Sequence, residues 1–401
     1  MIKNFLLIIL HLPIVILSKF IKRDKNIWIF GAWFGDKYTD NPKYLFEYVN
    51  KHNPEIKAIW LTTDKKTLKM LKHKGYKAYF TYSFAGYFYS MIAKYSFICT
   101  CFSDINKYTV SNQKVINLWH GIPLKKIMND NKFLECNQKD RNVVVKNVKC
   151  FLDNIRDFQY YTTIVDSDMM KAIFERAFKG YSKRVDIVGQ TRCDSFLYEI
   201  EKTPFVKKLI FLKEHNNKVG IFMPTCRREK LYDEFWEYFS KELDILNNRM
   251  KSMNIVLLIK LHYYQLKRLE NISVSYSNLI FVRDEDINQD IYSILPVTDF
   301  LITDYSSIFF DYLYTNKPIF FFSFDKEEYL TRDDEMYFEY DDIIPGKQAK
   351  SWTELYEILN EYINGIDKYQ SKRKEIMDMV FMYQDGNNCG RIVEFIKNLD
   401  K

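Results

Sequence analysis

Residues 299–324 read DFLITDYSSIFFDYLYTNKPIFFFSF, and this stretch decides the fold class. It contains two short apolar runs, 299–304 and 317–324, which flank a helical pattern over residues 307–316. Continuous apolar strands that alternate with helices are typical of a parallel sheet that is covered on both faces. The stretch therefore predicts a strand–helix–strand unit of an α/β protein.

The same alternation extends along most of the chain. Nine further apolar runs predict strands at 26–34, 56–62, 95–100, 114–119, 162–167, 184–189, 219–225, 255–262 and 279–284. The 401 residues exceed the roughly 250–300 residues at which a single core stops growing. A polar, lysine-rich helix near 195–217 separates two sets of strands. We therefore expect two doubly wound, Rossmann-like domains whose carboxyl strand ends face a central cleft, where ligands bind.

The N-terminal segment combines an apolar run with a basic cluster. The run from Asn4 to Ser18 is uncharged and contains His11 and Pro13, and it is followed by Lys19, Lys22, Arg23 and Lys25. It is shorter than the ~20 apolar residues that cross a bilayer. No small-residue cleavage site follows, which disfavours a signal peptide. We expect residues 1–25 to associate with an anionic membrane surface; the alternative is a buried core helix.

Composition and missing motifs exclude several classes. The net charge of +7 is spread along the chain without a nucleic-acid-binding motif, so an anionic substrate or membrane is the expected partner. The seven cysteines include no CxxC pair, as expected for reduced thiols. No phosphate-binding G-x-x-x-x-G-K-[ST] loop, strand-linked G-x-G-x-x-G or G-x-S-x-G elbow occurs. Acidic triplets at 166–168 and 284–286 resemble metal-binding D-x-D motifs, but the first lies at an expected helix cap, so no metal site is assigned.

Residues 117–127, NLWHGIPLKKI, place a histidine at a strand end. Gly121 and Pro123 interrupt regular structure, so His120 is predicted on a turn, where catalytic side chains are commonly presented. The alternative is a half-buried turn histidine that binds a backbone carbonyl.

Polar residues also follow other predicted strands. Asp304, Ser306 and Ser307 lead into the helix that carries Asp311, and hydroxyls at a helix start suit a phosphate. A simple N-cap is the alternative for Ser306. The remaining strand ends carry Lys260 and His262, Arg227, and Arg192, which can neutralise or bind an anionic substrate.

Six segments carry a family resemblance: WHGIPLKKI, GQTRCD, MPTCRRE, KLH, LITDYSSIFFDYLYTNKPIFFFSFDKEEY and QDGNNCGRI. Together they resemble the CDP-glycerol:poly(glycerophosphate) glycerophosphotransferase family over most of residues 26–395. The resemblance implies a GT-B fold at the cytoplasmic face of the bacterial membrane, peripheral or monotopic. It also implies transfer of glycerol phosphate or ribitol phosphate from a CDP-polyol to a hydroxyl of a lipid-linked teichoic acid or capsular polymer.

The resemblance assigns roles to domains and residues. Residues 26–195 would form the acceptor-side domain, 196–375 the CDP-donor domain, and 376–401 a C-terminal helix that packs back on the first. His120 and His262 match the family's histidines. The substrate-binding candidates are Gly121, Arg192, Thr225, Arg227, Asp304, Ser306, Ser307 and Asp311. Ile122, Tyr263, Thr191 and Cys193 depart from the family's motifs, which affects loop shape and the choice of substrate.

These observations predict a mechanism. His120 would act as general base on the acceptor hydroxyl while CMP leaves, and His262, Arg227 and the two serines would hold the diphosphate. No resident cofactor is required, although a role for a divalent cation such as Mg²⁺ stays open. The sequence also leaves open whether the donor carries glycerol or ribitol, and whether the enzyme is a single-addition primase or a polymerase. Two alternatives are a GT-B glycosyltransferase that uses a CMP- or UDP-sugar and a non-catalytic, lipid-anchored scaffold. No nucleic-acid partner is expected.

Overall fold

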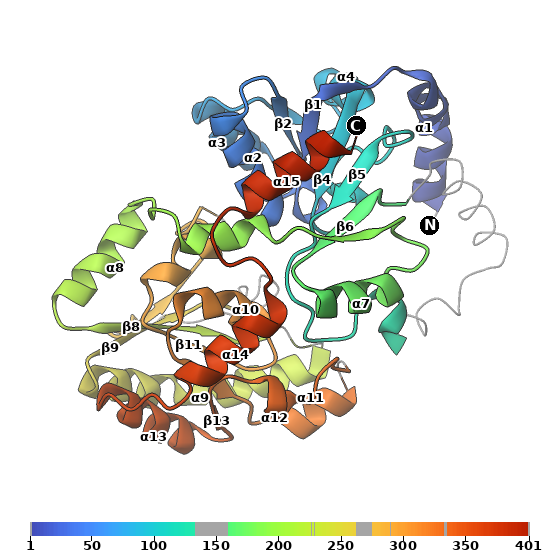
Figure 1. Ribbon diagram of the computed structural model, residues 1–401. Coiled ribbons are helices and arrows are strands. Elements are labelled where there is room, and N and C mark those ends of the chain that lie inside the picture. The colour runs from blue at the N-terminus through green and yellow to red at the C-terminus, as the bar shows by residue number, and fades with distance from the viewer. Residues whose placement is uncertain are drawn as a thin grey trace. The chain divides into compact units, whose positions relative to one another are not determined.

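The chain forms two units, each with one parallel sheet. The computed structural model describes residues 2–132, 159–225, 227, 229–261, 275–288, 290–332 and 335–399. Unit 1 comprises Met1–His120, Met128–Leu197 and Phe381–Lys401, and unit 2 comprises Gly121–Ile127 and Tyr198–Val380. In each unit helices pack against the sheet (Figure 1).

Unit 1 contains a seven-stranded sheet in the order β3-β2-β1-β4-β5-β6-β7, and all its pairs are parallel. Its strands are β1 (Asp24–Phe30), β2 (Lys57–Thr62), β3 (Ala78–Phe80), β4 (Ala93–Ile98), β5 (Lys114–Asn117), β6 (Thr162–Val165) and β7 (Val185–Ile187). This is the doubly wound order, in which the direction of the chain across the sheet reverses between β1 and β4. The reversal leaves a crevice at the carboxyl ends of those two strands.

The core of unit 1 explains why these segments fold as they do. The side chains of Trp28 and Phe30 on β1 are at most 1% exposed, as expected for a strand that is covered on both faces. The unit's helices are α2 (Asp40–His52), α3 (Lys65–His73), α4 (Phe84–Ile92), α7 (Asp168–Ala177) and α15 (Asn388–Asn398). Phe46 of α2 and Ile392 of α15 belong to the same buried cluster as Trp28. The C-terminal helix thus completes the core of unit 1, beside α2 (Figure 1).

Unit 2 repeats this plan with a six-stranded parallel sheet in the order β10-β9-β8-β11-β12-β13. Its strands are β8 (Lys218–Met223), β9 (Ile255–Ile259), β10 (Leu279–Phe281), β11 (Phe300–Thr303), β12 (Ile319–Phe322) and β13 (Lys347–Ala349). Its helices are α8 (Pro204–Glu214), α9 (Glu229–Ser252), α10 (Ile308–Tyr312), α11 (Lys326–Arg332), α12 (Tyr340–Ile343), α13 (Trp352–Ile363) and α14 (Gln370–Val380). The chain reverses across this sheet between β8 and β11, so a second crevice is expected there.

The predicted α/β class and all eleven predicted strands are confirmed, although most strands are shorter than predicted. Two strands were missed, β3 and β13. Each has only three residues, and the sequence KQA of β13 lacks an apolar run. The lysine-rich helix predicted near 195–217 corresponds to α8.

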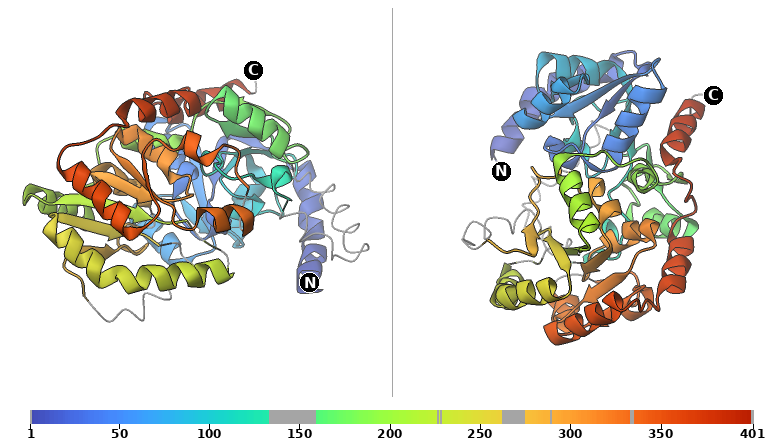
Figure 2. Two further views of the ribbon diagram at one scale, coloured as in Figure 1. Left: turned by 90° about the horizontal axis from the view of Figure 1, so that it is seen from below. Right: turned by 90° about the vertical axis from the view of Figure 1, so that its left-hand side faces the viewer.

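Helix α1 (Ile2–Phe20) lies along the outside of unit 1, where it is dark blue in Figure 2. One face of its carboxyl-terminal half is buried, because Val15 and Ser18 are at most 1% exposed. The Arg23 guanidinium, just beyond the helix, donates to the backbone carbonyls of Ser90 at 2.8 Å and Thr109 at 2.9 Å. These contacts attach α1 to unit 1.

The other face of α1 is open. Ile16 is 47%, Leu17 53% and Phe20 81% exposed. No helix in the described part of the chain has both the length and the apolar character needed to cross a bilayer.

Candidate active site

The crevice of unit 1 is formed by the loops that follow β1 and β4. Asp104 is buried and accepts hydrogen bonds from the backbone N–H groups of Cys99 at 2.9 Å, Thr100 at 2.8 Å and Phe34 at 2.8 Å. A Cβ atom on Gly31 would lie 2.0 Å from the Asp104 carbonyl oxygen, so only glycine allows this approach. The two loops are therefore held together as one platform.

The loop after β1 has a strained backbone. Trp33, Phe34 and Gly35 have φ angles of 47°, 60° and 85°, in the left-handed region that bulky residues rarely adopt. The Asp104 carboxylate holds the N–H of Phe34, and the Trp33 indole N–H donates to Asp40 at 3.2 Å. Strain of this kind concentrates at functional sites, where the surroundings enforce it.

His120 lies beside this platform, just beyond β5. Its neighbour Trp119 also has a left-handed backbone, with φ 54°, and the Asn117 side chain accepts a hydrogen bond from the Trp119 N–H at 3.0 Å. The His120 ring stacks on the Trp119 ring at 4.0 Å and lies 5.6 Å from the Trp33 ring. His120 is thus on a turn at a strand end, where the sequence predicted it.

One hydrogen bond decides which nitrogen of His120 can act as a base. Its Nδ1 atom lies 2.7 Å from the backbone carbonyl oxygen of Cys99. A carbonyl only accepts, so Nδ1 carries the proton in the neutral ring, and Nε2 keeps its lone pair. The carbonyl contact that was the alternative reading of His120 is present, and it leaves Nε2 as the ring nitrogen with a lone pair.

Electrostatics keep this ring neutral near pH 7. Burial lowers the pKa of His120, while the Asp40 carboxylate raises it by a smaller amount, so the pKa stays below its ordinary value. Asp40 is itself paired with Arg192 at 2.9 Å. Arg192 is fully buried inside unit 1, where it holds Asp40, and its predicted contact with substrate stays a prediction.

The crevice of unit 2 contains a buried ion network. Asp304, after β11, accepts a hydrogen bond from the Thr225 N–H at 2.7 Å and pairs with Arg227 at 2.9 Å. The Arg227 guanidinium also pairs with Asp325 at 2.6 Å, and its side chain has no exposed surface. Burial alone would lower the pKa of Arg227, but the two carboxylates raise it above its ordinary value. Arg227 therefore has a structural role in joining three loops, and its predicted phosphate contact stays a prediction.

Three hydroxyls at this crevice have no strong hydrogen bond to any residue that the structure describes. The Thr225 hydroxyl is buried without a hydrogen-bond partner in the described residues. The Ser306 hydroxyl accepts only a long contact of 3.4 Å from the Ile308 N–H. Ser307 occupies the N-cap position of α10, but its side chain makes no capping bond. These hydroxyls fit the predicted role of binding donor phosphates better than the N-cap alternative.

The other predicted residues have separate surroundings. Asp311 is buried in unit 2 and accepts a hydrogen bond from the Tyr292 hydroxyl at 2.8 Å. Gly121, with φ 142°, begins the segment of unit 2 that follows His120. His262 lies outside the described residues.

The segment after His120 is fixed within unit 2. Lys126 donates its backbone N–H to the Glu335 carbonyl at 2.8 Å, and its ammonium pairs with the Glu335 carboxylate at 2.7 Å. The Lys125 ammonium lies 4.9 Å from the centre of the Tyr329 ring. The two lysines after His120 therefore help to hold the chain in place.

Each acidic triplet includes a residue with a structural contact. Ser167 caps α7 by accepting a hydrogen bond from the Met170 N–H, and Asp284 pairs with Lys260 at 2.7 Å. Within the ranges that the structure describes, no group of three or more His, Cys, Asp or Glu side chains is placed to hold a metal ion.

These two doubly wound units, with His120 beside one crevice and the hydroxyls of Thr225, Ser306 and Ser307 at the other, define an α/β protein with two candidate ligand sites. The chain belongs to the CDP-glycerol:poly(glycerophosphate) glycerophosphotransferase family, whose model matches residues 14–398. The family and the transferase class that the sequence predicted are thus confirmed.

Curated relatives of two lengths match the chain. The teichoic acid poly(glycerol phosphate) polymerase of Staphylococcus epidermidis is 26% identical over 389 residues, which cover 92% of this chain and 50% of that protein. The teichoic acid glycerol-phosphate transferase of Staphylococcus aureus is 24% identical, and the match covers 93% of each. The chain thus spans half the length of the first relative and nearly all of the second.

The fold is similar to that of a solved structure, the wall teichoic acid polymerase TagF. The two share 23% sequence identity with a TM-score of 0.72, over 99% of this chain and 95% of that one. This likeness confirms the α/β fold with its parallel sheets.

Proposed function

We propose that the protein transfers a polyol phosphate from a CDP-polyol to a hydroxyl of a lipid-linked teichoic acid or capsular polymer and releases CMP. The observation that carries the proposal is the His120 ring, whose Nδ1 atom is bonded to the Cys99 carbonyl so that Nε2 is the basic nitrogen. The family match and the glycerol-phosphate relatives support the donor class.

The proposed reaction uses the lone pair of Nε2. The acceptor O–H gives its proton to Nε2 of His120 as the acceptor oxygen attacks the phosphorus atom that bears the polyol. The bond between that phosphorus and the bridging oxygen breaks, and CMP leaves with the bonding electrons. The imidazolium that forms is stabilised by the Cys99 carbonyl and by the negative charge of Asp40. A positioned base contributes roughly 10²- to 10⁴-fold to the rate.

The donor diphosphate is assigned to the crevice of unit 2. Thr225, Ser306 and Ser307 offer hydroxyl donors there. His262, cationic or neutral, and the cationic Arg227 are the other predicted partners of the phosphates. The likeness to TagF supports the GT-B fold class as part of this proposal.

A donor panel tests the function. Purified protein is incubated with CDP-glycerol, CDP-ribitol, a CMP-sugar and a UDP-sugar in the presence of a glycerol-phosphate oligomer, and nucleotide release is measured. We expect CMP from at least one CDP-polyol and no release from the sugar nucleotides. Release from a sugar nucleotide alone would identify the glycosyltransferase alternative, and absence of donor binding by calorimetry would identify a scaffold.

We also propose that the protein binds peripherally to the cytoplasmic face of the membrane through α1. The open face of α1 exposes Phe20 and Leu17, and the neighbouring α4 exposes Phe84 at 88%. Lys22 and Lys25, next to α1, are also exposed. Apolar side chains beside basic ones favour an anionic lipid surface.

Substitution tests this better than deletion, because Val15 and Ser18 pack against unit 1 and their loss would disturb its core. Phe20→Glu with Phe84→Glu should reduce co-sedimentation with anionic lipid vesicles. Phe211→Glu, at a 57% exposed phenylalanine of unit 2, is the control. Equal sedimentation of all three proteins would contradict membrane binding through this face.

A further inference from the structure

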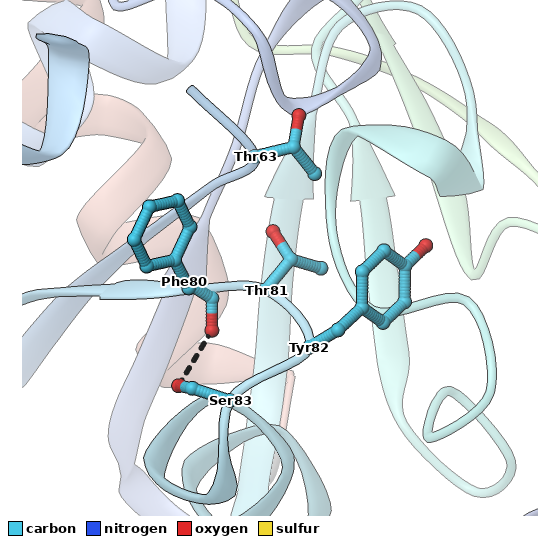
Figure 3. A pocket seen from close by; sticks show the side chains of 5 residues that line it. All are labelled: Thr63, Phe80, Thr81, Tyr82 and Ser83. Atoms are coloured by element: carbon cyan, nitrogen blue, oxygen red, sulfur yellow. Dashed lines mark hydrogen bonds between the residues drawn. The ribbon is translucent and has the colours of Figure 1, made fainter. Parts of the chain in front are cut away.

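A second hollow lies at the carboxyl edge of the unit 1 sheet, away from the crevice. It has a volume of about 350 Å³, enough for a small ligand, and is lined by Thr63, Phe80, Thr81, Tyr82 and Ser83. In Figure 3, Thr81 lies between the rings of Phe80 and Tyr82, with Thr63 beyond it. Thr63 follows β2 and the other four residues end or follow β3, so the pocket opens at the same carboxyl edge of the sheet as the crevice between β1 and β4.

The Thr81 hydroxyl is the feature that points to a ligand. Thr81 is 1% exposed, and its hydroxyl has no hydrogen-bond partner in the described structure. Its backbone is fixed, because the Thr81 N–H donates to the Thr62 carbonyl at 3.0 Å and its carbonyl accepts from Asn106 at 3.2 Å. Buried polar groups of native proteins are nearly always bonded, so an unpaired hydroxyl in a pocket wall suggests a partner supplied by a ligand.

The start of α4 adds a site for an anion. Ser83 caps this nine-residue helix and accepts a hydrogen bond from the Gly86 N–H at 3.1 Å. A Cβ atom on Gly86 would lie 2.2 Å from the Phe80 carbonyl oxygen, so the helix begins directly against the pocket wall. The first amides and the dipole of a helix favour a phosphate. The five lining residues carry no charge, and hydroxyls beside aromatic rings suit a polyol.

The strained loop after β1 connects this pocket with His120. The Gly35 carbonyl accepts hydrogen bonds from the Thr63 N–H at 2.8 Å and from the Thr62 hydroxyl at 2.7 Å. At the other end of the loop, the Trp33 ring lies 5.6 Å from the His120 ring. Between them Phe34 is 57% exposed. The strand order places β3 four positions from β5, or about 19 Å at a strand spacing of 4.8 Å.

We propose that this pocket binds a polyol-phosphate unit of the acceptor chain, at a distance from the hydroxyl that reacts at His120, and that Phe34 supports the chain in between. The inference rests on the proposed function, in which His120 acts on the acceptor and therefore places the acceptor at this edge of unit 1. The separation from His120 requires an acceptor of several units, so the pocket selects for acceptor length.

The test compares short and long acceptors. Thr81→Val and Phe34→Ala are assayed for CMP release with glycerol phosphate acceptors of one unit and of six or more units. In Thr81→Val we expect KM for the long acceptor to rise about tenfold, as for loss of one good hydrogen bond, with kcat and donor affinity unchanged. In Phe34→Ala we expect KM for the long acceptor to rise as well. KM for the one-unit acceptor should not change. Phe211→Ala, which removes an equally exposed ring from unit 2, should leave both KM values unchanged.

Two readouts separate this role from a structural one. Thr81→Val removes an unpaired hydroxyl, so the melting temperature should stay the same or rise, while calorimetric affinity for the long oligomer falls. An unchanged dependence on acceptor length in both variants would refute the inference while leaving the proposed function intact. Equal losses with short and long acceptors would refute it as well. If the wild-type protein releases no CMP with any CDP-polyol, the proposed function fails, and this inference fails with it.

Discussion

Replacing His120 by asparagine should separate its catalytic role from its structural one. The Asn Nδ2 atom falls near the position of the histidine Nδ1 atom, so the variant can still donate a hydrogen bond to the Cys99 carbonyl. It has no nitrogen lone pair to replace Nε2. We therefore expect kcat to fall by about 10²- to 10⁴-fold, the contribution of a positioned base, with little change in donor affinity.

His120→Ala measures what the ring contributes to the stability of the fold. It removes the base and also leaves the carbonyl of Cys99, a residue with no exposed surface, without its donor. An unpaired buried acceptor costs about 1–3 kcal/mol. The alanine variant should thus lose as much activity as the asparagine variant but unfold at a lower urea concentration.

The assay measures CMP release at saturating donor over about pH 4.5–8.5, roughly two units on either side of the ordinary histidine pKa. Donor affinity is measured by calorimetry, and stability by urea unfolding. Burial lowers the pKa of His120, and only the neutral ring is a base. The wild-type kcat should therefore fall as the pH drops through a value below the ordinary histidine pKa, and the residual rate of the variants should lack this limb. The stability gained from the neutral buried ring is present above the ordinary pKa and is lost as the pH falls below it.

His215 supplies a matched control. Its Nδ1 atom also lies 2.8 Å from a carbonyl, that of Phe211, and its ring centre lies 4.0 Å from that of the tilted Phe211 ring. His215, however, lies on the surface of unit 2. His215→Asn should keep full activity. Turnover of His120→Asn within threefold of the wild type would refute the base assignment. Loss of donor binding with turnover retained at saturating donor would make His120 a phosphate ligand instead.

Two further predictions concern unit 2. Ser306→Ala combined with Ser307→Ala should weaken CDP-polyol binding by about 1–3 kcal/mol. The free energy of unfolding should not change, because neither hydroxyl makes a normal capping bond. Unchanged donor affinity in calorimetry would remove the serines from the site. Arg227→Met should destabilise the protein by about 3–5 kcal/mol in urea unfolding, because it leaves Asp304 and Asp325 buried without their cation, and a loss below about 1 kcal/mol would contradict the structural role.

Local patterns predicted the strands because each long strand is a continuous apolar run. β11, with the sequence FLIT, is fully buried and pairs with β8 and β12 on its two sides. The same rule fails for β13, whose three residues are mostly polar and whose strand character comes only from pairing with β12. The turn that carries His120 was predictable for a similar reason, since Gly121 and Pro123 mark it locally.

The ion pairs of the site could not be predicted, because their partners are far apart in the sequence. Asp40 and Arg192 are 152 residues apart, and Arg227 and Asp325 are 98 residues apart. Sequence reasoning gave both arginines to the substrate because arginine suits phosphate, and no local pattern shows a distant carboxylate. The one available signal was the position of each arginine after a buried apolar strand. An arginine that is buried there requires a carboxylate partner.

The strained residues around His120 explain why the ring is held so firmly. Trp33, Phe34 and Trp119 have left-handed backbone conformations, which are unfavourable for residues with bulky side chains. The strain persists because Asp104 holds the Phe34 N–H and Asn117 holds the Trp119 N–H. In return, the two indole rings lie against His120, and the Cys99 carbonyl fixes its Nδ1 atom. In the proposed reaction Nε2 must present its lone pair to a hydroxyl. The Cys99 carbonyl favours that form, because the other tautomer, with its proton on Nε2, would offer the acceptor an N–H and no lone pair.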